Sequence, residues 1–397
     1  MEKSRSVVEI EGSPSWRRRK KGKGVGIIDD WPAGATIGGL AIAALPDLAR
    51  MRRERFQKLQ DQLEAQGDSA PHLCTLYGDG VPADLPEDHL HGPLFPDLDD
   101  GVDLFAQTLA DHFSTGARIG VDHQTHAMLR GVQGVDWVDA AEVTSAAKIT
   151  KTPDEVACIR NPQRLNELAM VDALRTLRPG VRQIDLSAVF LRRVFELGAS
   201  AGGIDPIWQV TAPNSELGPW TLHGDLAYPT VATDRFLREG DVIWVDAGIT
   251  WEGYASDYGR TRNAGADPVP DDRQQAQFRR WRAVVDAELD ILKRGVSALQ
   301  LDRAAIEAND GVRPWIEQFY LAHGVGTDSA EMPLIGTDFG EGFDEQLIMQ
   351  PGMVTVFEPV IWEDGAAGYR SEDIVAMTDT GWVKLSGSTY DPYGFAA

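Results

Sequence analysis

The sequence is poor in cysteine, in long apolar runs and in positive charge. Cys74 and Cys158 are the two cysteines among 397 residues, too few for a disulfide framework and typical of a reducing compartment. No apolar run reaches the roughly 18 residues that a membrane helix needs, and the first residues lack the apolar stretch of a signal peptide. These absences predict a cytoplasmic protein that has no membrane segment.

Acidic residues greatly outnumber basic ones. The 61 Asp and Glu residues against 38 Lys and Arg residues give a formal charge of −23 at pH 7. A surface of that charge repels phosphate backbones and anionic lipids, so neither nucleic acid nor a membrane is an expected partner. The length is sufficient for two domains with substantial cores.

The chain divides into three segments, of which two precede residue 151. Residues 1–45 carry a basic cluster and a Gly/Ala-rich stretch, which predict a disordered basic extension; an anionic-surface anchor or a nucleic-acid arm is the alternative. Residues 46–150 show helical periodicity at 46–66 and 102–113 and an apolar strand at 118–121, the pattern of a small α/β domain. Its histidines lack metal-ligand spacing, and we interpret them as surface or structural side chains: His72, His89, His91, His112, His123 and His126.

The third segment, residues 151–397, opens with a strong helix start. A threonine cap, a proline in the first turn and a glutamate three residues after the cap occupy positions 152–155. The helix is expected to run toward Leu177, with a kink or a break at Pro162.

A short internal repeat lies in the same segment. Leu177–Val181 (LRPGV) matches Leu292–Val296 (LKRGV) 115 residues later, and each copy lies between a long expected helix and a shorter one. Two similar halves, each made of helices and an antiparallel sheet, would place a shared site at their junction.

The most informative stretch is residues 241–262. Val242–Val245 is a continuous apolar run, typical of a strand buried on both faces, and it leads into Asp246. Asp257 follows 11 residues later, a separation that lets a hairpin return and set the two carboxylates side by side. Core strands rarely carry an aspartate without a compensating cation, although two strand-end aspartates that cap turns are the alternative.

Three further side chains complete an oxygen-rich set. His323 stands in AHGVG, where glycines allow close backbone approach, Glu358 follows the apolar strand MVTVF, and Glu372 lies at the head of another strand. Four carboxylates and one imidazole suit divalent ions such as Mn²⁺, Co²⁺, Fe²⁺ or Zn²⁺. Two such ions about 3.5–4 Å apart, bridged by carboxylates and a water, generate a hydroxide nucleophile near neutral pH.

The order of these residues resembles the pita-bread metallopeptidases, the superfamily of methionine aminopeptidase, aminopeptidase P and prolidase. The resemblance covers about residues 150–390: two aspartates 11 residues apart, then His-Gly-x-Gly, Glu-Pro and Arg-x-Glu-Asp. The flank Tyr254–Thr261 and Arg370 are most similar to the aminopeptidase P and prolidase branch. The resemblance implies an α+β protein with a C-terminal pita-bread (creatinase/aminopeptidase) fold at 151–397 and a shortened creatinase-type N-terminal α/β domain at 46–150.

The same resemblance implies a role for each of the five ligands. Asp246 would chelate one metal ion, and His323 and Glu358 would bind the other. Asp257 and Glu372 would bridge the two ions.

It also implies catalytic residues around the ligands. Glu358 would act as the general base, with His223 and Arg370 beside the centre. One position departs from the family pattern, because Ala330 stands where the family has a histidine ahead of Glu-x-Pro. That histidine is thought to stabilise the tetrahedral intermediate, and losing one such donor typically costs about 10²–10³ in rate.

The resemblance therefore implies a binuclear metal-dependent hydrolase of the Xaa-Pro aminopeptidase or dipeptidase type, acting on small peptides. It would hold two divalent ions, Mn²⁺ first among them, and form a homodimer through the first domain. Two alternatives stay open: a non-peptidase enzyme on the same fold, dimethylsulfoniopropionate lyase-like or creatinase-like, and a catalytically impaired binding module. Retention of all five ligands argues against the creatinase-like branch, which has lost them, and against the binding module.

Overall fold

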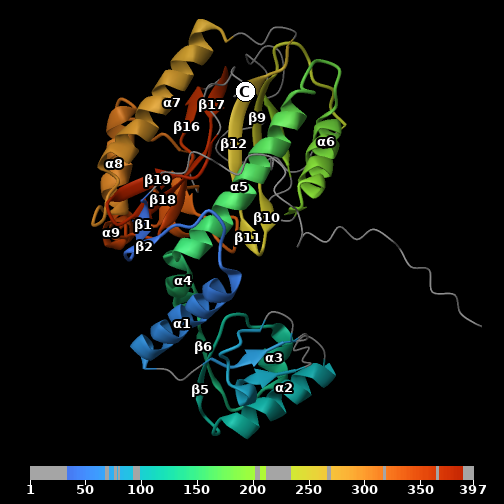
Figure 1. Cartoon of the computed structure of the whole chain (residues 1–397), viewed down its shortest axis with the longest axis vertical. Helices are drawn as coiled ribbons and strands as arrows, with labels where there is room; N and C mark the ends of the chain where they lie inside the picture. Colours follow the sequence, from blue (N-terminus) through green and yellow to red (C-terminus); the bar gives the residue numbers. More distant parts are fainter. Residues whose placement is uncertain are drawn as a thin grey trace, which may run out of the picture. The chain divides into compact units, whose positions relative to one another are not determined.

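The computed structural model contains a mixture of helices and mainly antiparallel sheets, which confirms the mixed α and β class. The described residues all belong to one compact unit, Gly34–Ala397 (Figure 1). They are residues 34–67, 71–75, 78, 81–92, 99–201, 206–211, 234–265, 270–315, 319–363 and 366–387. The α-helices in these ranges are α1 (Leu48–Gln66), α2 (Asp99–His112), α3 (His126–Gly131), α4 (Ala141–Ile149), α5 (Pro153–Leu174), α6 (Gln183–Glu196), α7 (Asp272–Ile291), α8 (Ala298–Ala308) and α9 (Glu341–Gln346). Within the same ranges, every helix is too short or too polar to cross a bilayer.

Two sheets position the site. One has three strands in the order β12-β9-β8, and the other has five in the order β14-β13-β15-β18-β19. Their strands are β8 (Ile207–Thr211), β9 (Val242–Ala247), β12 (Tyr258–Asn263), β13 (Ala322–Gly324), β14 (Glu331–Ile335), β15 (Val354–Phe357), β18 (Asp373–Thr378) and β19 (Gly381–Lys384). The other strands form smaller sheets: β1 (Thr36–Ile37), β2 (Leu40–Ala41), β3 (Leu73–Cys74), β4 (Leu90–His91), β5 (Arg118–Val121), β6 (Asp136–Asp139), β7 (Ser200–Ala201), β10 (Ile249–Trp251), β11 (Tyr254–Ala255), β16 (Val360–Glu363) and β17 (Ala366–Arg370).

The two halves expected from the internal repeat are present. Each has a long helix followed by a shorter one, α5 and α6 in the first half and α7 and α8 in the second, and Figure 1 shows the two pairs on either side of the strands. A glycine with positive φ makes each connection, Gly180 at 84° and Gly295 at 91°. The amide of Gly180 donates to Leu237 and that of Gly295 donates to Met349. The same turn therefore anchors each helix pair to the segment that leads into the strands of the site.

The first helix of the repeat differs in one respect from the sequence expectation. α5 has the predicted capping box between Thr152 and Glu155. It continues through Pro162 without a break and ends at Leu174, three residues before the expected end. Most of its length is buried, so tertiary packing on both sides holds the helix together across the proline.

The elements expected in residues 46–150 are present. α1, α2 and β5 correspond to the predicted helices at 46–66 and 102–113 and to the predicted strand at 118–121. β5 pairs in parallel with β6. The apolar cluster beside β5 and α2 is small, and its buried residues are Val102, Phe105, Leu109, Met128 and Val132.

The hairpin of β1 and β2 lies inside the segment for which an extension was predicted. Asp379 accepts hydrogen bonds from the hydroxyl of Thr36 and the amides of Gly38 and Gly39 at 2.9–3.0 Å. Residues 34–45 are therefore part of the folded unit, and the predicted boundary at residue 45 is wrong for them. Residues 1–33, which include the basic cluster, lie outside the described residues.

Three carboxyl side chains are buried at the contacts among α7, α8 and α9. Glu288 is fully buried, and both its carboxyl oxygens lack a hydrogen-bond partner. Asp302 shares a hydrogen bond with Asp344. Burial, and then the charge of Asp344, raises the pKa of Asp302 to about 8. Burial, and then the charge of Asp302, also raises the pKa of Glu288.

Asp302→Asn is expected to make stability less dependent on pH. The unfolded chain releases the Asp302 proton near pH 4, whereas the folded protein keeps it up to about pH 8. The stability that this proton contributes is therefore fully present below pH 4 and is lost as the pH rises toward about 8. With asparagine at this position, the unfolding free energy should fall less steeply with rising pH, by up to about 1.4 kcal/mol per pH unit. Urea unfolding between pH 5 and 8 measures this, with Asp310→Asn, an exposed site just beyond α8, as control. Equal slopes for wild type and Asp302→Asn would contradict the expectation.

Candidate metal centre

Two of the expected ligands come from the first half. Asp246 lies in β9, which is buried along its whole length, as the apolar run predicts. Asp257 directly precedes β12, and β12 returns antiparallel to β9 with Gly259 opposite Asp246. The hairpin therefore sets both carboxylates at one end of this strand pair, where they are 2% and 3% exposed.

The other three expected ligands come from the second half. His323 lies in β13, Glu358 directly follows β15, and Glu372 directly precedes β18. β15 and β18 are antiparallel, with Phe357 opposite Asp373. The next pair in this register is Glu358 and Glu372, so the register of the sheet brings their carboxylates to the same end.

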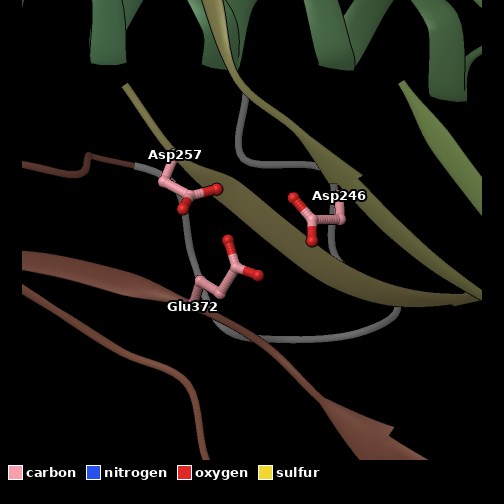
Figure 2. A group of neighbouring side chains, drawn as sticks. All are labelled: Asp246, Asp257 and Glu372. Atoms are coloured by element: carbon pink, nitrogen blue, oxygen red, sulfur yellow. The ribbon is translucent and has the colours of Figure 1, made fainter. Parts of the chain in front are cut away.

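The two groups of ligands meet between the halves. Carboxylate oxygens of Asp246, Asp257 and Glu372 lie within 4.8 Å of one another, and Figure 2 shows the three side chains pointing toward a common point. His323 Nε2 lies 3.3 Å from Asp257 Oδ2 and 3.3 Å from Glu358 Oε1. The structure thus brings together all five residues for which metal ligation was predicted.

Gly259 lets the two sheets approach each other. A Cβ at this position would lie 2.4 Å from Glu372 Cδ, so glycine leaves the space that this carboxylate occupies. The amide of Glu372 donates to the carbonyl of Gly259 at 3.0 Å, and Arg260 Nη1 donates to the carbonyls of both residues. Thr261 Oγ1 donates to the carbonyl of Arg370 at 2.6 Å. β12 therefore holds the backbone that carries the last ligand.

The carbonyl group of the next residue in β13 holds His323 in one tautomer. Its Nδ1 lies 2.8 Å from the carbonyl oxygen of Gly324, which can only accept, so Nδ1 donates and Nε2 faces the carboxylates. A Cβ on Gly324 would lie 2.3 Å from the carbonyl oxygen of Met332. The glycine that follows the histidine therefore permits the close backbone approach expected from the sequence.

Arg370 places a positive charge among the carboxylates of this centre. Its guanidinium lies 3.0 Å from Asp246 Oδ2, 2.5 Å from Glu358 Oε2 and 2.6 Å from Glu372 Oε1. Four buried carboxylates beside one guanidinium leave an excess of negative charge. Burial, and next the charge of Asp246, raises the pKa of Asp257 and of Glu372 well above the usual range.

These residues fit a pair of divalent metal ions. Asp246 Oδ1, Asp257 Oδ1 and Glu372 Oε2 are buried and have no hydrogen-bond partner. Buried polar atoms rarely stay unpaired unless an ion or a water molecule binds them. Two divalent ions would balance the charge of four carboxylates, and an oxygen-rich donor set with one imidazole suits Mn²⁺, Co²⁺, Fe²⁺ or Zn²⁺.

α5 supports the two aspartates through side chains that sequence reasoning missed. Asn166 Nδ2 donates to the carbonyl of Ala247 at 2.6 Å and to Ser256 Oγ at 3.1 Å. Gln163 Oε1 accepts from the amide of Asp257 at 3.3 Å. Polar residues on a helix ordinarily indicate a solvated face. One signal in the sequence could have identified them. Gln163 and Asn166 lie three residues apart, so they share one face of a helix rich in small and apolar residues, which indicates a buried polar face.

Tyr320 is a second residue that sequence reasoning missed. Its ring centroid lies 5.0 Å from that of His323 in an edge-to-face contact. Burial, and then the charges of Glu358 and Asp257, raises the pKa of Tyr320. The phenol therefore remains a neutral hydrogen-bond donor beside the centre at physiological pH.

Two further positions were singled out in the sequence, His223 and Ala330. His223 lies outside the described residues. Ala330 is exposed and directly precedes β14, and the adjacent Glu331 forms an ion pair of 2.7 Å with the buried Lys151.

Curated proteins of known family are similar to this chain. The sequence profile of metallopeptidase family M24 matches residues 157–379. An Xaa-Pro dipeptidase of Pyrococcus furiosus is 26% identical over 253 residues, covering 62% of this chain and 65% of that protein. The probable dipeptidase PepE of Mycobacterium tuberculosis is 28% identical over 263 residues, covering 65% of this chain and 64% of that protein. The chain thus spans just under two thirds of the length of these relatives.

Solved structures share the fold. A prolidase from Pyrococcus furiosus superimposes with a TM-score of 0.61 at 22% identity, covering 76% of this chain and 82% of that one. Dipeptidase PepE from Mycobacterium ulcerans gives 0.65 at 23% identity, covering 86% and 97%. These likenesses support the pita-bread fold expected for the third segment. Because the profile covers more than half of the chain and includes all five expected ligands, the chain belongs to metallopeptidase family M24.

Proposed function

We propose that the chain is a dipeptidase that hydrolyses Xaa-Pro peptides with two divalent metal ions, Mn²⁺ first among them. The observation that carries this proposal is the convergence of five buried side chains between the two halves: Asp246, Asp257, His323, Glu358 and Glu372. Support also comes from the relatives, of which one is an Xaa-Pro dipeptidase and another a probable dipeptidase.

The five side chains would hold the metal ions in the way that the family resemblance implies. Asp246 would chelate one ion, and His323 and Glu358 would bind the other. Asp257 and Glu372, whose oxygens lie close to those of Asp246, would bridge. When bound, such ions polarise a carbonyl group and lower the pKa of water.

We propose Glu358 as the carboxylate that accepts a proton. Arg370 Nη2 lies 2.5 Å from Glu358 Oε2 and fixes that oxygen, while Glu358 Oε1 faces His323 Nε2 at 3.3 Å. A carboxylate that is buried and held in one orientation needs little reorganisation when charge develops beside it. Arg370 therefore acts as a positioning residue for the proposed base.

Tyr320→Phe is expected to lower kcat by about 10- to 100-fold. The phenol is a neutral donor beside His323 and can meet negative charge that develops on the carbonyl oxygen of the scissile bond. Because this interaction strengthens in the transition state, kcat and kcat/KM should fall together, with little change in KM. Steady-state kinetics on an Xaa-Pro dipeptide measure this, and unchanged metal content shows that the ligands are intact. A kcat equal to that of the wild type would remove Tyr320 from the mechanism.

The rival functions depend on Ala330. Without the family's second histidine, the site could have been reshaped for a non-peptide substrate such as dimethylsulfoniopropionate, or could serve binding alone. Creatinase-like chemistry fits less well, because that branch lacks the metal ligands that are present here.

Turnover of a small substrate panel tests the proposal. The panel contains an Xaa-Pro dipeptide, an Xaa-Pro-Yaa tripeptide, creatine and dimethylsulfoniopropionate, each with Mn²⁺-loaded protein and with chelator-treated protein. A dipeptide with alanine in place of proline is the matched control for specificity. We expect Mn²⁺-dependent release of proline from the dipeptide. If only creatine or dimethylsulfoniopropionate is turned over, the protein is a non-peptidase enzyme on this fold. If no substrate is turned over although two ions are bound, the binding module is favoured.

The first domain is part of the same proposal. We propose that residues 46–150 are a shortened creatinase-type domain and that the chain forms a homodimer through it. The described strands of this segment occur in two-stranded pairs, β3 with β4 and β5 with β6, which supports a reduced sheet. Light scattering of the whole chain should give the mass of two chains, and the mass of one chain would contradict the dimer.

A further inference from the structure

Four histidines of the second segment meet in a cluster outside the metal centre. The ring centroids of His72 and His89 lie 4.0 Å apart, and those of His72 and His91 lie 5.2 Å apart. His112 closes the group at 5.2 Å from His72 and 4.7 Å from His91. The absence of metal-ligand spacing in the sequence therefore did not reveal this cluster, which brings together positions up to 40 residues apart.

The fold explains why these four residues meet. β3 and β4 pair in parallel, with Leu73 opposite Leu90 and Cys74 opposite His91. This register sets His72, just before β3, beside His89, just before β4. His112 is the last residue of α2. The cluster thus links a two-stranded sheet to a helix in a segment whose apolar core is small.

The nitrogens of the cluster are available as ligands. His72 Nδ1 lies 2.9 Å from His91 Nε2, so one of these rings donates and the other accepts through a lone pair. His89 Nδ1 lies 3.1 Å from the carbonyl oxygen of Pro71 and must donate to it, which leaves His89 Nε2 free of a hydrogen when the ring is neutral. Burial, and then the neighbouring imidazoles, lowers the pKa of His72 to about 4, so this ring is neutral at pH 7.

We propose that His72, His89, His91 and His112 bind one divalent transition-metal ion, of the class formed by Zn²⁺, Ni²⁺ and Cu²⁺. A donor set of imidazoles favours these ions over Mn²⁺ and Mg²⁺, which prefer oxygen. The first three rings are partly buried and His112 is exposed, so an ion has an entry from solvent.

One pair of nitrogens in the cluster already lies near the spacing of two metal ligands. The planes of His72 and His91 lie 3° apart, with the two nitrogens 2.9 Å from each other. Two nitrogens that each lie about 2.0–2.1 Å from a tetrahedral ion are about 3.3–3.4 Å apart. Binding would widen this gap by a few tenths of an ångström and exchange one hydrogen bond for two metal bonds. The stacked rings of His72 and His89 would also rotate about their side-chain bonds, so that the lone pairs of the four imidazoles converge on the ion.

The bound ion would stabilise the segment that carries it. An isolated two-stranded sheet is marginal, and a small core supplies little additional stability. The ion would connect β4, the chain segments just before β3 and β4, and α2. Its binding free energy would then contribute to the folding free energy of this segment. This proposal stands independently of the peptidase assignment.

Metal titration of an untagged protein tests the proposal. The background is the double variant Asp257→Ala/Glu372→Ala, which disables the acidic centre so that the two sites are counted separately. We expect one equivalent of Cu²⁺, with an electron paramagnetic resonance spectrum that shows nitrogen hyperfine splitting, and the same stoichiometry for Ni²⁺ and Zn²⁺. Zn²⁺ should also slow hydrogen exchange of residues 71–75 and 81–92.

Variants in the same background separate the cluster from adventitious binding. His112→Ala changes an exposed residue at a helix end and should weaken Cu²⁺ binding at least about tenfold. The double variant His72→Ala/His91→Ala should no longer bind the one equivalent of Cu²⁺. His126 is an exposed histidine outside the cluster, so His126→Ala should leave Cu²⁺ binding unchanged. If both cluster variants still bind one equivalent of Cu²⁺ as tightly as the background protein, the proposal is wrong. It is also wrong if the background protein, with unchanged circular dichroism, binds no Cu²⁺.

Discussion

Glu372→Ala is expected to lose most of both metal ions and to lower kcat/KM on an Xaa-Pro dipeptide by on the order of 10³-fold or more. The oxygens of Glu372 lie within 4.8 Å of those of Asp246 and Asp257, and Gly259 leaves the space that its carboxylate fills. A bridging ligand holds both ions, and their charge stabilises the transition state by several kcal/mol, which corresponds to a rate factor of about 10³. Elemental analysis after reconstitution with Mn²⁺, followed by steady-state kinetics, measures both effects.

A matched control separates loss of the ions from loss of the fold. Glu345→Ala removes an exposed carboxylate from α9 and should keep two ions and full activity. Mn²⁺ at 100 times its dissociation constant should stabilise the wild type by about 2.7 kcal/mol per site, and Glu372→Ala should lose most of this gain. A Glu372→Ala protein that keeps two ions and the wild-type rate would contradict the bridging role.

Ala330→His is expected to raise kcat on an Xaa-Pro dipeptide by about tenfold or more. Resembling metallopeptidases carry a histidine at this position, and one donor to a developing oxyanion is worth about 10²–10³ in rate. Because Tyr320 already offers a donor, we expect only part of that factor. Ala330 is exposed, so the larger side chain enters no packed core. The gain should appear in kcat as well as in kcat/KM, since the interaction is stronger in the transition state than in the ground state.

A neighbouring substitution and a double variant sharpen this experiment. Ser329→His adds the same imidazole one residue earlier and should give no gain. Ala330→His should also restore part of the rate that Tyr320→Phe loses, because the added donor would meet the same developing charge. If Ala330→His leaves cleavage of the proline dipeptide negligible and harms another reaction of the panel, the site is shaped for a different substrate.

The sequence predicted those parts of the centre that depend on local pattern. A continuous apolar run predicted the buried β9, which carries Asp246 near its end, because a strand without alternation is covered on both faces. Glycines around His323 predicted close backbone approach, and the close contact between Gly324 and the backbone of Met332 confirms it. The repeat at residues 177–181 and 292–296 predicted two halves, and a glycine with positive φ follows the long helix in each, Gly180 and Gly295.

Other features depend on contacts that no local pattern records. The histidine cluster arises from the register of β3 with β4 and from the position at which α2 ends, neither of which can be read from ligand spacing. The polar side chains of Gln163 and Asn166 look like surface residues until α5 packs over the ends of β9 and β12. α5 passes through Pro162 unbroken because its surroundings are packed, so tertiary structure overrides the local preference for a break.

Anomalous diffraction from crystals of the Mn²⁺-loaded protein tests the two-metal centre most directly. We expect two peaks about 3.5–4 Å apart, with Asp257 and Glu372 between them. One peak should lie beside Asp246 and the other beside His323 and Glu358. Crystals of the Glu372→Ala variant, grown and loaded in the same way, should lack most of both peaks. A wild-type map without a peak among these five side chains would contradict the account.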